Sequence, residues 1–239
     1  MKRSWMHGVM GMTLAGGMIL AMAIGTGRAA DGDFTDKRSK ISYCVGLDIG
    51  RSFSQGEWDL DMEQLIEGIR HAYKKEPWKV ENDEMMRVIS EYRQELQEKQ
   101  KQKHEQAAES NRTEGKKFLD ENAAKKAVTV LPSGLQYEVI KTGQGPSPKA
   151  TDKVKVHYRG TLIDGTEFDS SHKNGQPVEF GVGQVIAGWS EALQLMQPGA
   201  VWRVVIPPEL GYGQRGAGQV IGPNAVLIFE IELLDILNP

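Results

Sequence analysis

The sequence predicts an α+β protein, in which an antiparallel sheet wraps around one short helix and follows an all-α segment and a long connecting helix. Residues 154–160 alternate apolar and polar side chains, which is typical of a half-buried strand. Residues 41–53 instead repeat apolar side chains every four positions, which is the spacing of a helix face. Residues 82–125 contain no proline and a single glycine, Gly115, which favours a continuous helix. The order of these patterns places the helical part before the sheet.

The first residues have the features of a secretion signal. A basic start at Lys2 and Arg3 is followed by an apolar run at residues 9–24. The small side chain of Ala29 predicts signal-peptidase cleavage next to it. We therefore expect residues 1–29 to be a signal peptide, the mature protein to be periplasmic or in the cell envelope, and no membrane span after cleavage. The apolar run is short for a span, although an uncleaved anchor is the alternative.

The overall charge and the cysteine content exclude several classes of partner. Removing residues 1–29 takes three basic and no acidic residues from a formal net charge of -3, and leaves -6. A mature chain of this charge has no overall attraction for nucleic acid or anionic lipid. The single cysteine, Cys44, excludes an internal disulfide and a zinc site with several thiolate ligands. Because Cys44 lies within an apolar pattern, we expect a buried, inert thiol.

Residues 41–96 predict a small helical domain, which follows a polar and flexible segment at residues 30–40. The apolar spacing gives a first helix, and Asp61 begins a capping-box pattern at the start of a second. A third helix loses its apolar side chains after Leu96. Two and a half amphipathic helices rarely bury a sufficient core alone. We therefore expect residues 41–96 to form a homodimerisation domain.

Residues 97–127 keep the helix-forming composition but have no apolar stripe. If residues 82–125 are helical throughout, they reach roughly 60 Å at about 1.5 Å per residue. A helix that is polar on all sides either bridges domains through solvent or is unstable. We expect a long connecting helix, and the alternative is a disordered charged linker.

Residues 128–239 predict the sheet-containing domain. Asp164-Gly165 separates two strand patterns and favours a tight hairpin turn. One short helical pattern contains Trp189, and the strongest strand patterns lie at residues 201–206 and 226–236. Several antiparallel strands with one helix give the α+β class.

Several motifs of this domain resemble, in the same order, those of the FKBP-type peptidyl-prolyl cis-trans isomerases. The motifs are Tyr158 and Phe168-Asp169 within VKVHYRGTLIDGTEFDSS, Val185-Ile186-Ala187-Gly188-Trp189, Leu210-Gly211-Tyr212-Gly213, Ile221-Gly222-Pro223-Asn224-Ala225 and Leu227–Leu233. This resemblance covers residues 128–239. In addition, the stretch SYCVGLDIGRSF is similar to the dimeric periplasmic members of the family, which include the macrophage infectivity potentiators.

The resemblance implies an enzyme that speeds rotation about the peptide bond before proline. The barrier to this rotation is about 18–20 kcal/mol, and no covalent bond has to break. No nucleophile, metal or cofactor is therefore implied; an apolar slot that holds a twisted amide better than a planar one is sufficient. The implied catalytic residues are Tyr158, Asp169 and Tyr212. The implied substrate-binding residues are Phe168, Val185, Ile186, Trp189, Ile221 and Phe229.

Each of these residues also has a simpler interpretation that the residues alone leave open. Trp189 and Phe229 fit an ordinary core, and Tyr158 fits cross-strand packing. Asp169, before two serines, fits a turn. The chain also departs from better-known members of the family, because Val178 stands where some carry phenylalanine, which predicts a wider pocket.

Two functions of different classes follow. The first is an exported isomerase that accelerates the folding of proline-containing, unfolded or partly folded polypeptides, and the resemblance also implies binding of macrolide inhibitors. The second is a dimeric holdase chaperone or binding module, in which two arms give avidity and the isomerase activity is secondary.

Overall fold

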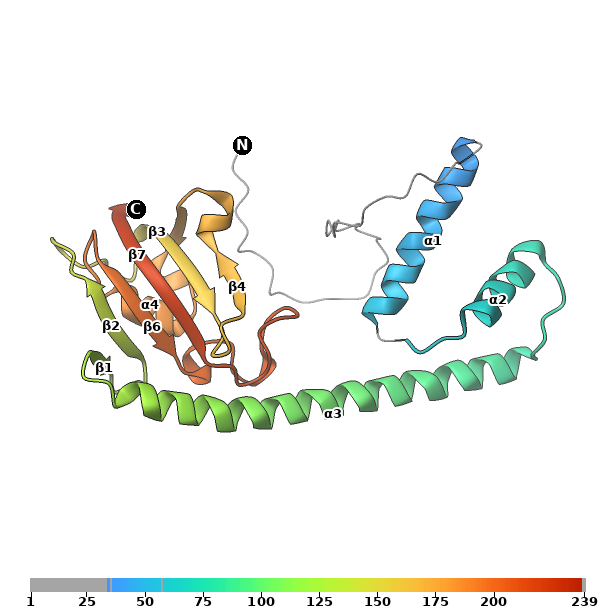
Figure 1. The fold of residues 1–239 in the computed structure, drawn as a ribbon, viewed down its shortest axis with the longest axis horizontal. Helices are drawn as coiled ribbons and strands as arrows, with labels where there is room; N and C mark the ends of the chain where they lie inside the picture. Colours follow the sequence, from blue (N-terminus) through green and yellow to red (C-terminus); the bar gives the residue numbers. More distant parts are fainter. Residues whose placement is uncertain (1–33, 35, 57, 238–239) are drawn as a thin grey trace. The chain divides into compact units, whose positions relative to one another are not determined.

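The computed structural model describes Phe34, residues 36–56 and residues 58–237 (Figure 1). The chain separates into two compact units, Met1–Lys79 and Val80–Pro239. In its described residues the first unit contains two helices, and the second unit contains a long helix and a sheet domain. The predicted signal peptide lies outside the described residues. Among the helices that the structure describes, none combines the length and the apolar content needed to cross a bilayer.

The helices of the first unit, α1 (Lys37–Gln55) and α2 (Met62–Lys74), each begin at an aspartate. The Asp36 carboxylate accepts a backbone N–H at 2.8 Å at the start of α1. The Asp61 carboxylate accepts two backbone N–H groups at 2.9 and 3.1 Å at the start of α2, as the sequence pattern predicts. These bonds satisfy N–H groups that have no partner inside their helix.

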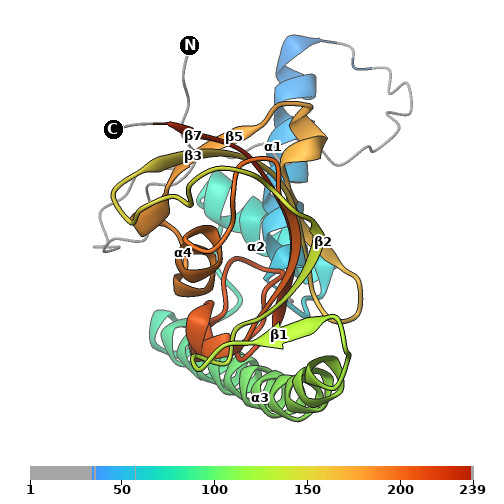
Figure 2. The ribbon, with the colours of Figure 1, turned by 90° about the vertical axis from the view of Figure 1, so that its left-hand side faces the viewer.

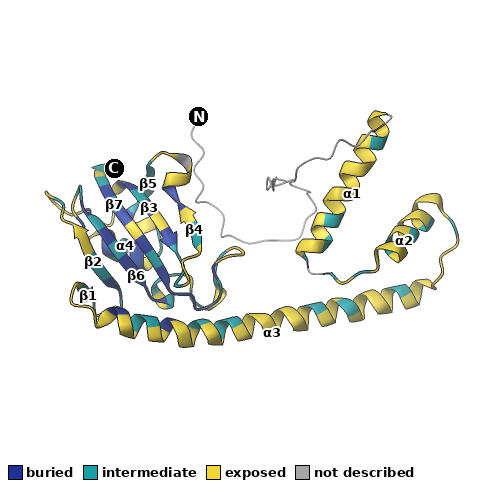
Figure 3. Ribbon diagram, viewed as in Figure 1, coloured by how far each residue is buried: buried dark blue, intermediate teal, exposed yellow. Residues whose placement is uncertain are grey.

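No residue of α1 or α2 is buried within this chain, although both helices carry large apolar side chains. Figure 3 shows the two helices mostly as exposed surface. Their exposed apolar residues are Ile41, Tyr43, Val45, Leu47, Ile49, Met62, Ile66, Ile69 and Tyr73. Cys44 is exposed as well, so the expectation of a buried thiol is wrong for the single chain. The reason is that nothing in the described part of the first unit covers this side of α1.

The long helix α3 (Asn82–Ala123) is continuous for 42 residues. Asp83 and Glu84 in its first turn suit the positive end of the helix dipole. Gly115 and Asn122 are its buried residues, and both lie toward its C-terminal end. This end of α3 therefore packs on the sheet domain through small and amide side chains. The sequence does not predict this contact, because residues 97–127 have no apolar stripe.

The second unit contains one antiparallel sheet in the order β1-β2-β6-β7-β3-β4, and β5 pairs with β3 outside this path. The strands are β1 (Val128–Val130), β2 (Gln136–Lys141), β3 (Lys153–Thr161), β4 (Glu167–Ser170), β5 (Val178–Gly181), β6 (Val201–Ile206) and β7 (Leu227–Leu237). The short helix α4 (Ala187–Leu193) lies on the concave side of the sheet, which curves around it (Figure 2). The predicted fold class is confirmed.

The core of this unit fills the space between α4 and the sheet. Leu193 of α4 is fully buried against inward-facing side chains of the strands. Along β7, the buried residues Phe229, Ile231 and Leu233 alternate with more exposed ones. This alternation puts one face of the sheet in the core and leaves the other face at the surface.

Candidate functional site

Strand β3 directs Tyr158 into the space between the sheet and α4. Val154 and Val156 are fully buried on the same face, and Tyr158 is 8% exposed. The intervening residues of β3 are more exposed, as the alternation in the sequence predicts. Across from the end of this face, β7 contributes Phe229, which is 4% exposed.

Trp189 of α4 lies at the centre of a group of aromatic rings. Its ring centroid is 5.2 Å from those of Tyr158 and Phe229 and 5.6 Å from that of Phe180. All three rings stand at 83° to 88° to the indole plane. Phe168 extends the group, with its ring at 84° to that of Phe229 and a centroid distance of 5.4 Å. Perpendicular contacts of this kind match the charge distribution of aromatic rings.

Phe180 belongs to this group but was not predicted from the sequence as a site residue. It lies in β5, opposite Val154 of β3, and its ring is 5.8 Å from that of Tyr158. The signal was present, because Val178 and Phe180 alternate with Glu179 in the strand pattern. Val178 pairs with Val156, so both residues of β5 face the same side as Tyr158.

Gly160 allows the aromatic rings of β4 and β7 to meet over β3. A Cβ at this position would lie 2.6 Å from Phe168 Cε2 and 2.8 Å from Phe229 Cε1. These distances are shorter than any normal carbon contact, so a side chain here would push the rings apart. The position of the Phe168 and Phe229 rings thus depends on the absence of a side chain at Gly160.

Asp169 gives the aromatic group a polar edge. The Tyr158 hydroxyl donates a hydrogen bond to Asp169 Oδ2 at 2.7 Å, and the Ser170 N–H donates to Asp169 Oδ1 at 2.9 Å. Burial, followed by this hydrogen bond, raises the pKa of Tyr158 above its ordinary value. Tyr158 therefore stays a neutral donor, while Asp169 is exposed on its other side.

The turn between β3 and β4 places Phe168 and Asp169 beside Tyr158. The Gly165 N–H donates to the Leu162 carbonyl at 3.0 Å, and the Leu162 N–H donates to the Thr166 carbonyl at 2.9 Å. Gly165 has φ +87°, whereas Asp164 does not have a positive φ. The hairpin therefore has one left-handed residue, rather than the two that the shortest Asp-Gly turns use.

The connection from β6 to β7 brings Tyr212 and Ile221 to the same region. Tyr212 is 41% exposed, and Ile221 is 9% exposed within the core group. Partial burial and then the negative charge of Asp169 raise the pKa of Tyr212. A backbone bridge between Ala217 and Ile221 closes the connection, with N–H to carbonyl distances of 2.8 and 3.1 Å.

Val185 and Ile186 lead into α4 and are half-buried against the same core. Ile186 is the N-cap of α4, and its carbonyl accepts the Ser190 N–H at 3.0 Å. Within the described residues no group accepts the Ile186 N–H. This N–H is therefore the kind of donor that a bound carbonyl could use. All nine residues that the sequence singled out thus lie in or around one region.

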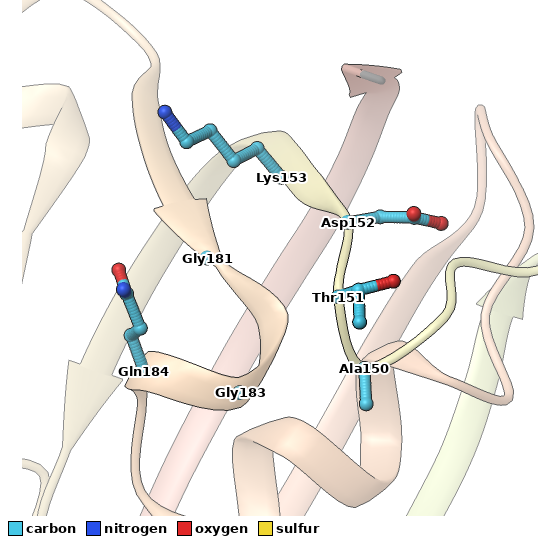
Figure 4. A pocket seen from close by; sticks show the side chains of 7 residues that line it. All are labelled: Ala150, Thr151, Asp152, Lys153, Gly181, Gly183 and Gln184. Atoms are coloured by element: carbon cyan, nitrogen blue, oxygen red, sulfur yellow. The ribbon is translucent and has the colours of Figure 1, made fainter. Parts of the chain in front are cut away.

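A hollow of about 310 Å³ lies elsewhere, at the beginning of β3. It is lined by Ala150, Thr151, Asp152, Lys153, Gly181, Gly183 and Gln184. Figure 4 shows Lys153 and Gln184 on one side and Thr151 and Asp152 pointing to the other, so the polar groups do not converge. It also has no aromatic ring in its lining. Its size alone does not make it a better candidate than the aromatic group.

The aromatic group and its rim support a conformational reaction better than a covalent one. Buried rings form an apolar surface, and hydroxyl, carboxylate and backbone N–H groups lie at its edge. A planar amide is more polar than a twisted one, because resonance separates charge between nitrogen and oxygen. An apolar surface therefore favours the twisted form, since the planar form loses more hydration on transfer from water.

Comparison with known families assigns both parts of the chain. A model described as "FKBP-type peptidyl-prolyl cis-trans isomerase" matches residues 145–234. A model described as "Domain amino terminal to FKBP-type peptidyl-prolyl isomerase" matches residues 38–139. The two matches together run from α1 into β7, and so include the exposed helices as well as the aromatic site.

Individual relatives agree with these matches over most of the chain. The outer membrane protein MIP of Legionella longbeachae is 40% identical over 95% of this chain and 98% of its own length. The FKBP-type 22 kDa peptidyl-prolyl cis-trans isomerase of Escherichia coli is 44% identical over 85% of this chain and 98% of its own. The crystal structure of FkpA from Escherichia coli has a TM-score of 0.65 at 36% identity, and covers 86% of this chain and 99% of that one.

Proposed function

This chain belongs to the FKBP-type peptidyl-prolyl cis-trans isomerases, and from that membership we propose that it is an exported folding enzyme which isomerises prolyl bonds in the aromatic site around Trp189. The single observation that carries the location is the perpendicular packing of three rings on Trp189. The substrates are proline-containing segments of unfolded or partly folded polypeptides. Prolyl isomerisation takes tens to hundreds of seconds without a catalyst, so it limits the folding of many chains.

The proposed roles follow from where each group lies. Trp189, together with Tyr158, Phe168, Phe180 and Phe229, receives the proline ring and the twisted amide. Contacts made only with the twisted amide lower the barrier, whereas contacts made equally with the planar amide do not. The catalytic residues Tyr158, Asp169 and Tyr212 form the polar edge near the rotating carbonyl.

The residues that flank the slot are proposed to hold the peptide backbone. The free N–H of Ile186 and the hydroxyl of Tyr212 donate to substrate carbonyls on either side of proline. Val185 and Ile221 supply apolar contact to the neighbouring side chains. The same recess is proposed to accept macrolide inhibitors, with Val178 leaving more room than a phenylalanine would.

We further propose that the mature protein acts in the periplasm or cell envelope as a homodimer held by residues 41–96. The basic and apolar character of residues 1–29 supports export. The exposed apolar side chains of α1 and α2 support pairing with a second copy, since the single chain leaves them in contact with water.

The proposed function is tested by the cis-to-trans relaxation of a tetrapeptide that contains proline, with the full-length protein. The wild type should accelerate the relaxation. Phe168→Leu removes one aromatic wall and should lower kcat/KM on the order of tenfold, because contacts to the twisted amide are lost. Tyr137→Leu is the matched control: it removes a ring that stacks on Trp202 at 4.3 Å and lies two strands from Phe229, and should keep the activity.

Two outcomes would overturn the proposal in different ways. Equal losses in Phe168→Leu and Tyr137→Leu would show that the aromatic group has no special role. Absence of acceleration by the wild type, with aggregation of an unfolded client still suppressed, would favour a holdase chaperone. The exposed apolar faces of α1 and α2 would then be the working surface.

A further inference from the structure

The connection that carries two of the proposed site residues is attached directly to the long helix. We define the site loop as residues 212–225, between β6 and β7. Figure 2 shows this connection lying against α3. Asn111 Nδ2 on α3 donates to the Pro223 carbonyl at 2.8 Å. In the reverse direction, Asn224 Nδ2 in the site loop donates to the Ala108 carbonyl on α3 at 3.2 Å.

The two hydrogen bonds lie on one face of α3. Ala108, Asn111 and Gly115 are spaced by three and four residues, which places them in a row along the helix. Gly115 is buried, and a Cβ there would lie 2.9 Å from Val226 Cγ2. The helix backbone thus comes very close to the end of the site loop. The residues on this face are small or polar, so the face does not appear as an apolar stripe in the sequence.

The same face of α3 is fixed again further along the helix. Asn122 is 1% exposed, and its amide donates to Gln136 Oε1 at 2.8 Å. Arg203 donates to Asn122 Oδ1 at 3.1 Å, and the Gln136 amide donates to the Leu119 carbonyl at 3.0 Å. These bonds join α3 to β2 and β6, so the helix is a fixed support for the loop rather than a loose neighbour.

Asn224 connects the helix to the turn that carries Tyr212. It has φ +55°, a left-handed conformation that asparagine tolerates better than most residues, and it is 8% exposed. Its backbone N–H donates at 2.8 Å to the carbonyl of Gly213, the residue after Tyr212. One buried asparagine therefore joins α3 to the Tyr212 turn, and it lies three residues along the chain from Ile221.

We propose that residues 108–115 of α3 form a support of the isomerase active site, and that Asn111 and Asn224 are positioning residues that hold the site loop over the substrate. This inference rests on the proposed function, which gives Tyr212 and Ile221 their roles. Tyr212 is the residue that depends most on this support. Tyr212 is 41% exposed, so side-chain packing holds it less firmly than the buried rings, and the backbone of the loop contributes more to where its hydroxyl lies.

The test uses full-length Asn111→Asp and Asn224→Asp. Both substitutions keep the size of the side chain and remove the amide donor, and aspartate also tolerates the left-handed conformation at position 224. Gln106→Glu makes the matched amide-to-carboxylate change at an exposed position of α3. Backbone hydrogen exchange in residues 212–225 should become faster in the two asparagine variants and remain unchanged in Gln106→Glu.

The kinetic result expected is a decrease in kcat/KM on the order of tenfold for the proline tetrapeptide, because a small displacement of a positioned group has a large effect on rate. In Tyr212→Phe, which removes the hydroxyl that the loop positions, Asn111→Asp should have a smaller effect than in the wild type. Such non-additivity would not arise from a general loss of stability.

The inference fails if the asparagine variants match Gln106→Glu in exchange and kinetics while Phe168→Leu remains impaired; the proposed function would then stand without the support from α3. Independent effects of Asn111→Asp and Tyr212→Phe, which multiply, would also contradict it. A wild type without isomerase activity would instead overturn the proposed function, and with it the catalytic meaning of the support.

Discussion

Tyr158 uses the two parts of its side chain for different purposes. The ring packs against Trp189 within the buried aromatic group, and the hydroxyl donates to Asp169 at 2.7 Å. A hydroxyl in an apolar site needs such a partner, because an unpaired polar group is costly to bury. Packing and polarity at the site therefore depend on each other at a single residue.

The raised pKa of Tyr158 predicts a dependence of stability on alkaline pH. In the unfolded chain its pKa is about 10, and in the folded protein burial and Asp169 raise it. The folded state therefore holds the proton more strongly, so this stabilisation is complete below about pH 10 and is lost as the pH rises toward the folded pKa. Urea unfolding of Tyr158→Phe should show about 1 kcal/mol less stability at pH 7, from the lost hydrogen bond.

Above pH 10, stability should fall less steeply with pH in Tyr158→Phe than in the wild type. Asp169→Asn is the control, since it keeps the shape of the partner and removes its charge. Its slope should lie between those of the wild type and Tyr158→Phe. Identical slopes in the three proteins would contradict the role assigned to Tyr158.

Most residues of the candidate site could be expected to lie together from the sequence, because motifs preserve the order and spacing of side chains. Tyr158, Phe168 and Trp189 lie close together in space, as the resemblance implies. Phe180 was overlooked because its strand has only four residues, so its alternation is brief. Asn111 could not be found from the sequence, since a polar residue in a polar helix carries no sign of a partner that is distant along the chain.

Among the elements, α3 shows most clearly what sequence patterns can and cannot predict. Its helical nature follows from composition, but its docking depends on a face of small and amide residues that hydropathy does not detect. Gly115 marks the point of closest approach, because even a methyl group there would lie 2.9 Å from Val226. The exposed part of α3 and its docked part are alike in composition and differ in what they touch.

Gly115→Val should separate α3 from the sheet domain. Valine has a slightly better helix propensity than glycine, so a loss of stability would come from the contact and not from the helix itself. We expect the free energy of unfolding to decrease by about 1–3 kcal/mol, as for other overpacked positions. Gly68→Val in α2, which has no neighbour within 4 Å, is the control. Equal stability of Gly115→Val and the wild type in urea would argue against tight docking.

For the molecule as a whole, the two units differ in how they are stabilised. The second unit has a core of side chains with little or no exposure, whereas the helices of the first unit bury nothing within the chain. Apolar burial provides roughly 1.5–3 kcal/mol for each large side chain. The described residues of the first unit therefore have no core of their own, and we propose that a second copy supplies the missing apolar contact.

Val45→Asp should convert the proposed dimer to a monomer in sedimentation velocity, because it places a charge in the middle of the apolar face of α1. Lys40→Asp places the same side chain at an exposed position that already carries a charge, on the side of α1 that also holds Lys37 and Arg51, and should leave the proposed dimer intact. Activity on a tetrapeptide should remain in both variants. A dimeric Val45→Asp protein would place the interface elsewhere.

Strand β7 lies in the middle of the sheet, between β6 and β3, although it is the last strand along the chain. During synthesis, the ribosome completes the other six strands before residues 227–237 emerge. Until then β3 and β6 each present an open edge to other nascent chains, which is a route to aggregation. A protein proposed to assist the folding of others is thus itself vulnerable during its own synthesis, until its last strand is in place.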